Sequence, residues 1–246
     1  MKNNLFNQKN LANIYAKPSI KSEIVSQILF GEKFRVLNKK KNWLKIKTSY
    51  DKYTGFLRNI KTINKFIPTH KVYKSKTRIF RKVGNKFIGS KKFLYFASKI
   101  SVSEKNYNFL KFNENEWIKK GDLKPINYYE KKFIKILRLF LNTKYLWGGK
   151  TSEGIDCSAL VQIYFFFNNI YFPRDTKDQL KFLRKTKKNK LYQSNKLYFW
   201  KGHVAVCLDK NLLIHAYGPR KKVVIMKKNK TVMEIKKNTN LDLELI

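Results

Sequence analysis

The segment that most restricts the fold of this chain is residues 160–167, which are apolar nearly all round a helix. Such a helix is normally buried at the centre of a domain. Asp156 lies just before the run and is a favourable N-cap, so we expect a buried helix that begins at Asp156-Cys157. With 246 residues, 43% of them hydrophobic, the chain is long enough to build a core around this helix.

The rest of the second half predicts one more helix and several strands. Strand patterns occur at residues 203–208, 212–217 and 223–226. Helices followed by a β-meander indicate an α+β domain, residues 127–246, that begins after Pro125. Five apolar residues at helical spacing, with lysines opposite, predict the amphipathic first helix of this domain: Phe133, Ile136, Leu137, Phe140 and Leu141.

The first half carries a weak internal repeat with an offset of 66 residues. Residues 29–36 align with 95–102, and residues 42–46 align with 108–112. Each copy alternates apolar and polar residues between turns, which predicts short strands. Units of this size favour two small SH3-like β-barrels, residues 1–68 and 69–126. Pro68 marks the boundary, and His70 beside it is expected to be structural.

The formal net charge of +39 first suggests a nucleic-acid partner. Of the 55 basic residues, however, only eight are arginine, and lysine, asparagine, isoleucine, phenylalanine and tyrosine are all abundant. This profile is typical of an AT-rich coding bias spread over the surface. Proteins that read guanine or phosphate favour the bidentate guanidinium. We therefore expect no specific nucleic-acid binding, and loose attraction to an acidic cell-wall polymer stays open.

The apolar runs of the chain bear on its location. Residues 1–10 contain no apolar stretch of the kind that a secretory signal needs. No apolar run is long enough to span a bilayer. We expect a cytoplasmic protein without a membrane span, with export by another route left open, and a monomer.

Cys157 is the candidate nucleophile. The unpaired N–H groups of a first helical turn lower the pKa of a thiol there and suit the oxyanion of a tetrahedral intermediate. The alternative is a small core residue, the commoner role of an isolated cysteine. Cys207 is the only other cysteine, and neither has metal-ligand spacing around it, so we expect no metal and no cofactor. A bridge between the two stays open, and it would remove the nucleophile.

Two of the three histidines fall on a predicted hairpin with Asp209 in its turn. A hairpin folded about Asp209 pairs His203 with His215, which places both side chains on one face with Cβ atoms about 5 Å apart. His203 is then suited to be the base of the thiol, and His215 to orient its ring. The alternative is two unrelated core histidines, and a register slip of one residue would undo the pairing. Cys207 is expected to fill the core.

The second half carries five ordered motifs: Tyr145-Leu146-Trp147-Gly148-Gly149, Asp156-Cys157-Ser158, Phe172-Pro173-Arg174-Asp175 with Gln179, Trp200-Lys201-Gly202-His203-Val204, and Leu213-Ile214-His215-Ala216. Taken together, these motifs resemble the NlpC/P60 family of papain-like cysteine peptidases. The resemblance implies that Cys157 is the nucleophile, His203 the base and His215 its orienter. It also implies that the substrate is bound by Tyr145, Trp147, Asp156 and Ser158, with Asp156 holding a substrate amine.

SH3-like modules ahead of such a domain resemble the dipeptidyl-peptidase subgroup, which cuts γ-D-glutamyl bonds in peptidoglycan stem peptides. The resemblance implies that a free amino-terminal L-Ala is required, with Glu32 and Tyr53 contributing to the closed end of the cleft. The chain departs from the family pattern at two places. Ala159 stands where the family usually has glycine after Asp-Cys-Ser, and Asn195-Lys196-Leu197 replaces Gly-Asp-Leu.

Three functions follow from these observations. The first is a thiol peptidase whose partner is a peptidoglycan stem peptide or muropeptide. The second keeps the same thiol for another acyl transfer, as in an amidase or transpeptidase. The third is a non-catalytic module that binds cell wall or nucleic acid through its SH3-like domains and lysine charge.

Overall fold

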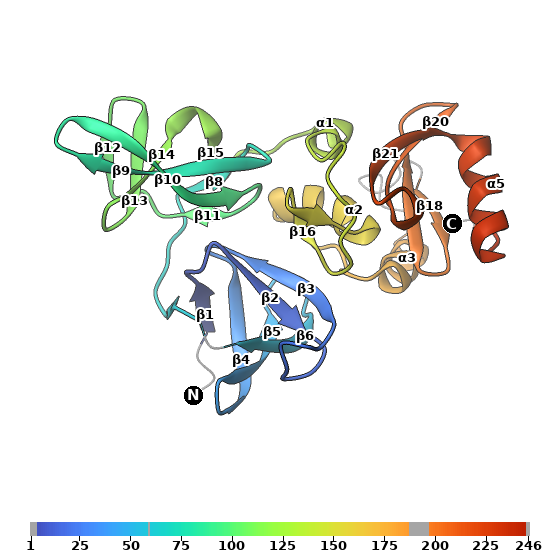
Figure 1. Ribbon diagram of the computed structural model, residues 1–246, viewed down its shortest axis with the longest axis horizontal. Coiled ribbons are helices and arrows are strands. Elements are labelled where there is room, and N and C mark those ends of the chain that lie inside the picture. The colour runs from blue at the N-terminus through green and yellow to red at the C-terminus, as the bar shows by residue number, and fades with distance from the viewer. Residues whose placement is uncertain (1–3, 59, 187–196, 245–246) are drawn as a thin grey trace. The chain divides into compact units, whose positions relative to one another are not determined.

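The computed structural model describes residues 4–58, 60–186 and 197–244 of the chain. It divides into two compact units, Met1–Glu130 and Lys131–Ile246, which are described separately (Figure 1). The first unit is built from strands, and the second combines helices with strands.

The first β module, residues 4–63, is one antiparallel sheet with the strand order β3-β2-β6-β5-β4-β1-β7. The predicted alternation is present in β5, where Leu44 and Ile46 are buried and Lys45 between them is exposed. The strands are β1 (Asn4–Asn7), β2 (Leu11–Tyr15), β3 (Ile24–Leu29), β4 (Lys33–Lys40), β5 (Trp43–Thr48), β6 (Thr54–Arg58) and β7 (Thr62–Ile63).

The second β module, residues 70–125, contains a five-stranded sheet, β10-β9-β14-β13-β12, and a three-stranded sheet, β11-β8-β15. His70 begins the module, and its Nδ1 lies 2.9 Å from the hydroxyl of Thr69. The strands are β8 (His70–Val72), β9 (Lys76–Val83), β10 (Lys86–Tyr95), β11 (Lys99–Ile100), β12 (Glu104–Asn106), β13 (Phe109–Asn113), β14 (Glu116–Lys119) and β15 (Leu123–Pro125).

The sequence repeat corresponds to a repeated turn. Gly31 and Ala97, 66 residues apart, both have left-handed backbones, with φ of 73° and 67°. The phenylalanine before each of them, Phe30 and Phe96, is buried. The repeat therefore records the same local geometry in both β modules.

The two β modules share a core at one of these turns. Phe30 belongs to the first module by sequence but packs in the apolar cluster of the second, edge to face with Phe112 at 5.6 Å between ring centroids. Its carbonyl accepts a hydrogen bond of 2.9 Å from the N–H of Lys99. A Cβ on Gly31 would lie 2.2 Å from the Lys99 carbonyl oxygen, so this close approach requires glycine. The modules thus form one unit.

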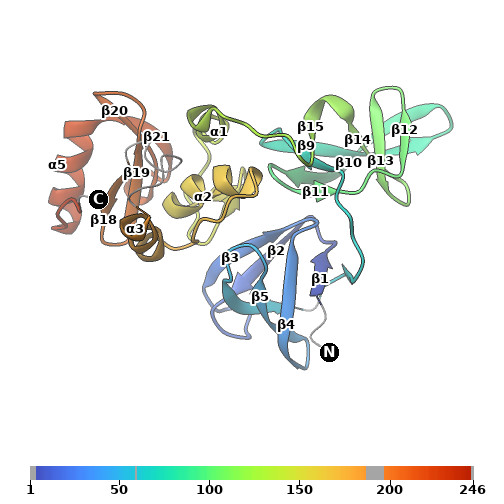
Figure 2. The ribbon, with the colours of Figure 1, turned by 180° about the vertical axis from the view of Figure 1, so that it is seen from behind.

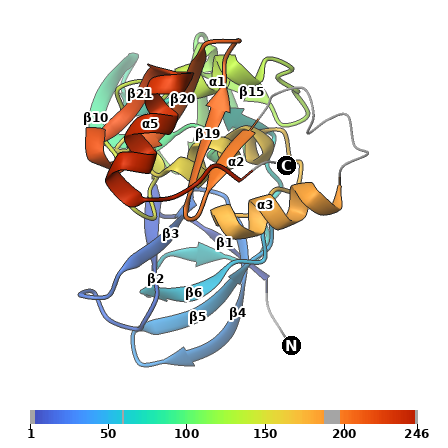
Figure 3. The same cartoon turned by 90° about the vertical axis from the view of Figure 1, so that its right-hand side faces the viewer.

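The second unit is built around a four-stranded antiparallel sheet, β18-β19-β20-β21. Helix α2 contacts β19 and β20, and α5 contacts β20 and β21. The sheet therefore lies between the two helices (Figures 2 and 3). The elements are α1 (Phe133–Arg138), β16 (Lys150–Thr151), β17 (Gly154–Ile155), α2 (Cys157–Phe167), α3 (Thr176–Lys185), β18 (Leu197–Trp200), β19 (His203–Cys207), β20 (Leu212–Tyr217), β21 (Lys222–Lys227) and α5 (Lys228–Thr239).

Helix α2 is buried along its whole length, as its apolar sequence predicts. All eleven residues from Cys157 to Phe167 are buried. Phe165 stacks on Phe172 with ring centroids 4.3 Å apart, and Phe133 of α1 meets Tyr164 edge to face at 4.7 Å. The core of this unit is therefore assembled on the helix that carries Cys157.

Helix α1 is shorter than the sequence predicts. It ends at Arg138, so Phe140 and Leu141 lie beyond it. The cause is Asn142, whose left-handed backbone (φ 65°) turns the chain toward β21, where its N–H donates to the Val223 carbonyl at 3.0 Å. Phe140 is still fully buried, whereas Leu141 is 39% exposed.

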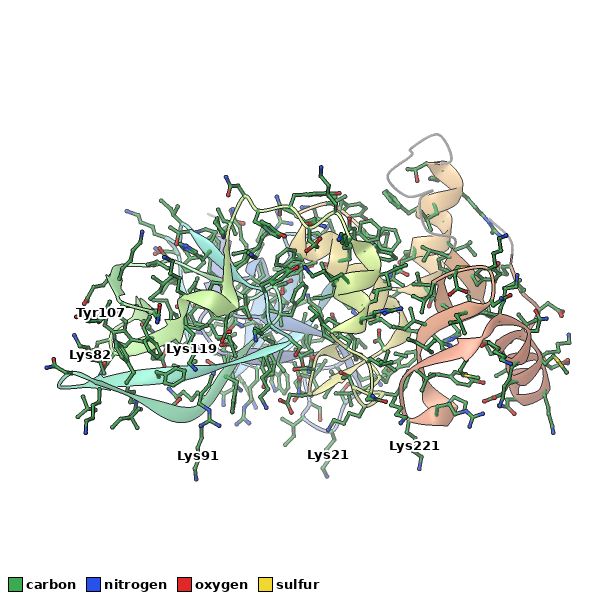
Figure 4. All side chains as sticks on the ribbon, turned by 90° about the horizontal axis from the view of Figure 1, so that it is seen from above. Lys21, Lys82, Lys91, Tyr107, Lys119 and Lys221 are labelled. Atoms are coloured by element: carbon green, nitrogen blue, oxygen red, sulfur yellow. The ribbon has the colours of Figure 1, made fainter. Side chains whose placement is uncertain are left out.

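The surface is rich in lysine on both units. Lys21, Lys91 and Lys221 are exposed and point away from the ribbon (Figure 4). Across the described part of the chain, no helix has the length and apolar character needed to cross a membrane.

Candidate active site

The first turn of α2 is organised by the carboxylate of Asp156. As the N-cap of the helix it accepts a hydrogen bond of 2.8 Å from the N–H of Ala159. Its other oxygen accepts one of 2.9 Å from the N–H of Gly148, in the glycine loop. The cap thus joins the glycine loop to the helix, and Asp156 is buried, with 5% of its surface exposed.

Arg174 completes this arrangement from the other side. Its guanidinium makes a two-pronged ion pair with Asp156, with Nη1 3.0 Å from Oδ1, and Nη1 also donates to the Ser158 hydroxyl at 2.8 Å. Both side chains of the pair are almost fully buried. A planar guanidinium matches a carboxylate in this geometry, which lysine does not reproduce.

Gln179 of α3 supports the same turn through the backbone. Its side-chain amide donates to the carbonyls of Ser158 and Pro173, each at 2.9 Å. Sequence reasoning noted Arg174 and Gln179 only as parts of a motif. Arg174 is one of only eight arginines among 55 basic residues, and this scarcity is the sequence signal for a bidentate partner.

Cys157 is 4% exposed, and the backbone on both sides of His203 contacts its sulfur. The thiol donates to the carbonyl of Gly202 at 3.8 Å, and the N–H groups of Val204 and Ser158 donate to the sulfur. Burial, and then the Asp156 carboxylate, raise the pKa of the thiol to about 12, against the opposing effect of those amides. The lowered pKa expected from the helix N-terminus is therefore wrong for this state, because desolvation outweighs the amides.

The hairpin exists, but its register differs from the expected one. Val206 lies opposite Ile214 and Cys207 opposite Leu213, so the turn is centred on Lys210 and not on Asp209. Continued to the strand ends, this register places Tyr217 opposite His203. His215 is the diagonal neighbour on the same face, because the shift preserves the alternation of side chains. The carboxylate of Asp209 displaces the centre by accepting from the N–H groups of Asn211 and Leu212.

The two histidines are hydrogen-bonded despite this shift. Nε2 of His203 lies 2.9 Å from Nδ1 of His215, and Nε2 of His215 lies 3.4 Å from the sulfur of Met226. Tyr217 stacks on the His215 ring, with centroids 4.7 Å apart. Burial lowers the pKa of His203 to about 4 and that of His215 to about 3, so both rings are neutral near pH 7.

The Cys157 thiol contacts the backbone on both sides of His203. Within the described ranges no hydrogen bond joins the Cys157 sulfur to an imidazole nitrogen. Unliganded active sites often have such long contacts, which shorten when substrate binds. Nδ1 of His203 is the ring nitrogen that remains available for the thiol proton, since Nε2 is engaged by His215.

Of the residues expected to bind substrate, Tyr145 and Trp147 remain accessible. Tyr145 is half-buried, and burial together with the charges of Cys157 and Asp156 raises the pKa of its phenol. Trp147 is 55% exposed. Ser158 is buried, and its hydroxyl donates to Asp156 while accepting from Arg174. Contacts of these residues with substrate stay predictions.

Glu32 and Tyr53 lie in the first unit. Glu32 is buried in the turn between β3 and β4, where its carboxylate accepts from the N–H of Leu29 at 3.0 Å. Tyr53 is half-buried, and its N–H donates to the hydroxyl of Thr48 at 2.8 Å.

The departures from the family pattern have different outcomes. Ala159 is fully buried, and its N–H still donates to the Asp156 cap, so the methyl group is accommodated. Asn195 and Lys196 lie outside the described residues. Cys157 and Cys207 are both free thiols. In the described ranges, His, Cys, Asp and Glu side chains form no group of three that could hold a metal ion.

Comparison with known proteins agrees with this geometry. Residues 142–240 match the NlpC/P60 family, and residues 9–59 match the bacterial SH3 domain. Dipeptidyl-peptidase 6 of Lysinibacillus sphaericus is 26% identical over 230 residues, covering 84% of each chain. Gamma-D-glutamyl-L-lysine dipeptidyl-peptidase of Bacillus subtilis is 24% identical over 236 residues, covering 86% of this chain and 78% of the other. The fold is also that of an NlpC/P60 family protein from Bacillus cereus, with a TM-score of 0.74, 17% identity, and coverage of 92% of this chain and 94% of that one.

Proposed function

Because the chain carries an NlpC/P60 domain behind a bacterial SH3 domain, we propose that it is a cysteine peptidase acting on peptidoglycan stem peptides. The bond it cleaves is the one between γ-D-Glu and the diamino acid. Two relatives similar over most of their length are named dipeptidyl-peptidases, and one of these names specifies γ-D-glutamyl-L-lysine. The catalytic domain is then papain-like, residues 127–246, behind SH3-like domains at 1–68 and 69–126.

One observation carries the proposal. The Cys157 sulfur contacts the carbonyl of Gly202 and the N–H of Val204, which flank His203, and His203 is hydrogen-bonded to His215. These contacts support an arrangement of nucleophile, base and orienting group, which is what nucleophilic catalysis needs.

The protonation states set the order of events. The resting site holds a neutral thiol and two neutral imidazoles, so His203 acts as a general base when the sulfur attacks the γ-D-Glu carbonyl. The thiol proton moves to Nδ1 of His203, and the resulting imidazolium is stabilised through its Nε2–H by His215. It then protonates the leaving amine of the diamino acid. Water hydrolyses the thioester, which returns the thiol.

In the first turn of α2 the N–H of Ala159 is bonded to the Asp156 cap, so the amides suited to the oxyanion of the tetrahedral intermediate are those of Cys157 and Ser158. Asp156 already accepts hydrogen bonds from Gly148, Ser158, Ala159 and Arg174, so it positions this turn, and its contact with a substrate amine stays a prediction. Tyr145, close enough to Cys157 to interact electrostatically, is suited to bind the substrate beside the sulfur.

We extend the proposal to a requirement for a free amino-terminal L-Ala. Its support is the dipeptidyl-peptidase names of the two relatives, which describe enzymes that release dipeptides. Glu32 and Tyr53 are the residues proposed to restrict the amino end, and Glu32→Gln tests the charge of the first with its shape preserved. We expect this variant to lose preference for a free amine over an acetylated one.

The deciding experiment supplies L-Ala-γ-D-Glu-diaminopimelate to the wild-type protein and to Cys157→Ala. We expect release of L-Ala-γ-D-Glu by wild type, and a loss of about 10⁴-fold or more in the variant. Cys207→Ala is the matched control and should retain activity. An inert tripeptide alongside cleaved intact muropeptides would remove the dipeptidyl-peptidase specificity only. An amide product formed with an added amine acceptor would indicate acyl transfer in place of hydrolysis.

A further inference from the structure

Both ring nitrogens of His215 have a partner in the structure. Nδ1 lies 2.9 Å from Nε2 of His203, and Nε2 lies 3.4 Å from the sulfur of Met226. The ring is fully buried, and Tyr217 covers it in parallel, at an interplanar angle of 16°. No water molecule or second side chain is therefore needed to explain the hydrogen bonding of this imidazole.

The two partners of His215 differ in what they can do. A thioether sulfur accepts a hydrogen bond weakly and has no hydrogen to donate. His203 Nε2 can donate or accept, according to its tautomer. A neutral imidazole carries one proton, so only its Nε2–H tautomer lets His215 bond to Met226, and that tautomer leaves Nδ1 as an acceptor.

The tautomer of His215 in turn determines the tautomer of His203. Since Nδ1 of His215 accepts, Nε2 of His203 carries the proton and donates it. Nδ1 of His203 is consequently without a proton and is the free base. The opposite order would place the His203 proton on Nδ1 and leave a lone pair of His215 facing the sulfur lone pairs of Met226.

We propose that Met226 is a positioning residue whose thioether fixes the tautomers of His215 and His203, and so presents Nδ1 of His203 as the base. The proposal rests on the thiol-peptidase function above and assigns a residue to its base side. Met226 does not touch the reacting atoms, because it acts through His215.

The fold holds the sulfur where this role requires it. Strand β21 pairs Val224 with His215 and Met226 with Leu213, so Met226 is the diagonal neighbour of His215 on the same face. Its side chain packs against the apolar cluster that includes Leu213, Tyr217 and Ile235 of α5. Packing by α5 thus supports the contact between sulfur and ring.

The test uses protein labelled with ¹⁵N in its three histidines, whose nitrogen shifts distinguish the two tautomers. Wild type should show both His203 and His215 as Nε2–H tautomers. Met226→Leu, which keeps the volume and removes the acceptor, should show mixed tautomers and a kcat lower by roughly 5-fold or more, with KM unchanged. Met233→Leu is the matched control, because Met233 is 72% exposed.

The outcomes separate the two proposals. A wild-type His215 found as the Nδ1–H tautomer, or a Met226→Leu variant with wild-type tautomers and kcat, would overturn the role of Met226. Wild-type protein with the expected tautomers but no activity on stem peptides would leave that role intact and remove the proposed function. The wild-type spectrum decides the first question even if the Met226→Leu variant does not fold.

Discussion

The two sides of the site are held by different physics. On the nucleophile side, which comprises Asp156, Cys157 and Arg174, a buried carboxylate is bonded to a guanidinium and to backbone N–H groups. On the base side, which comprises His203, His215 and Met226, two neutral rings and a thioether form a chain of hydrogen bonds. Charge-assisted hydrogen bonds are about twice as strong as neutral ones, so the first side is fixed by bond strength.

The base side is held instead by which ring nitrogens of His203 and His215 carry a proton. Each of its bonds is modest, and the geometry is supplied by the sheet, which places His203, His215 and Met226 on one face. In a site of this kind, a substitution or a change of pH can alter the protonation of the base while the residues around the thiol stay in place.

Removal of the arginine should break the nucleophile side. We expect Arg174→Met to lower the free energy of unfolding of the second unit by about 3 to 5 kcal/mol, because it leaves the buried Asp156 carboxylate without its partner. Urea unfolding of purified protein measures this loss. Arg220→Met is the matched control, since Arg220 forms a similar two-pronged pair with Glu234 on the surface. It should cost at most about 1 kcal/mol, and equal losses for both variants would contradict the contrast.

Loss of the orienting ring should affect catalysis more than folding. We expect His215→Ala to lower kcat by roughly 10²- to 10³-fold, since His203 then has no acceptor for its Nε2–H. His215→Asn can offer a carbonyl oxygen in that place and should recover part of the rate. Steady-state kinetics on the stem tripeptide, together with a thermal unfolding curve, separates the two effects. Equal rates for the two variants would mean that ring volume, and not the hydrogen bond, matters.

The base side should also make the protein sensitive to acid. Both histidines have a pKa below the 6.5 of the unfolded chain, so the unfolded state binds more protons from about pH 6.5 down to about 4 for His203 and about 3 for His215. Stability therefore falls as pH falls through this window, by up to about 1.4 kcal/mol per pH unit for each histidine. The difference in urea stability between wild type and a His203→Asn/His215→Asn variant isolates this share. His70, whose pKa burial also lowers, remains in both proteins. A difference that does not change with pH would refute the neutral state of the two rings.

Much of this site could be predicted from the sequence because its parts have local signatures. The apolar run of α2 and the cap at Asp156 predict the buried helix, and alternation predicts β19, β20 and β21. The pairing of His203 with His215 is confirmed as a contact, although the predicted register was wrong. The contact is kept because a register shift of an even number of residues leaves both side chains on the same face of the sheet.

The remaining features depend on distant contacts that carry no local pattern. The raised pKa of Cys157 follows from burial, which a helix-terminus argument does not include. Arg174 approaches Asp156 from 18 residues away, and Met226 reaches His215 from the next strand. The early end of α1 likewise depends on Asn142 bonding to β21. Each is decided by tertiary packing, and a single sequence does not record it.

The complete burial of α2 ties activity to the integrity of the core. Cys157, the proposed nucleophile, is the first residue of a helix whose side chains are all buried, so every residue of that helix is also part of the core. A substitution in that helix has no exposed position to occupy, so each one changes the packing of the core. We therefore expect the rate of the proposed reaction to report on core packing as well. Substitutions that loosen the core should lower turnover before they unfold the protein.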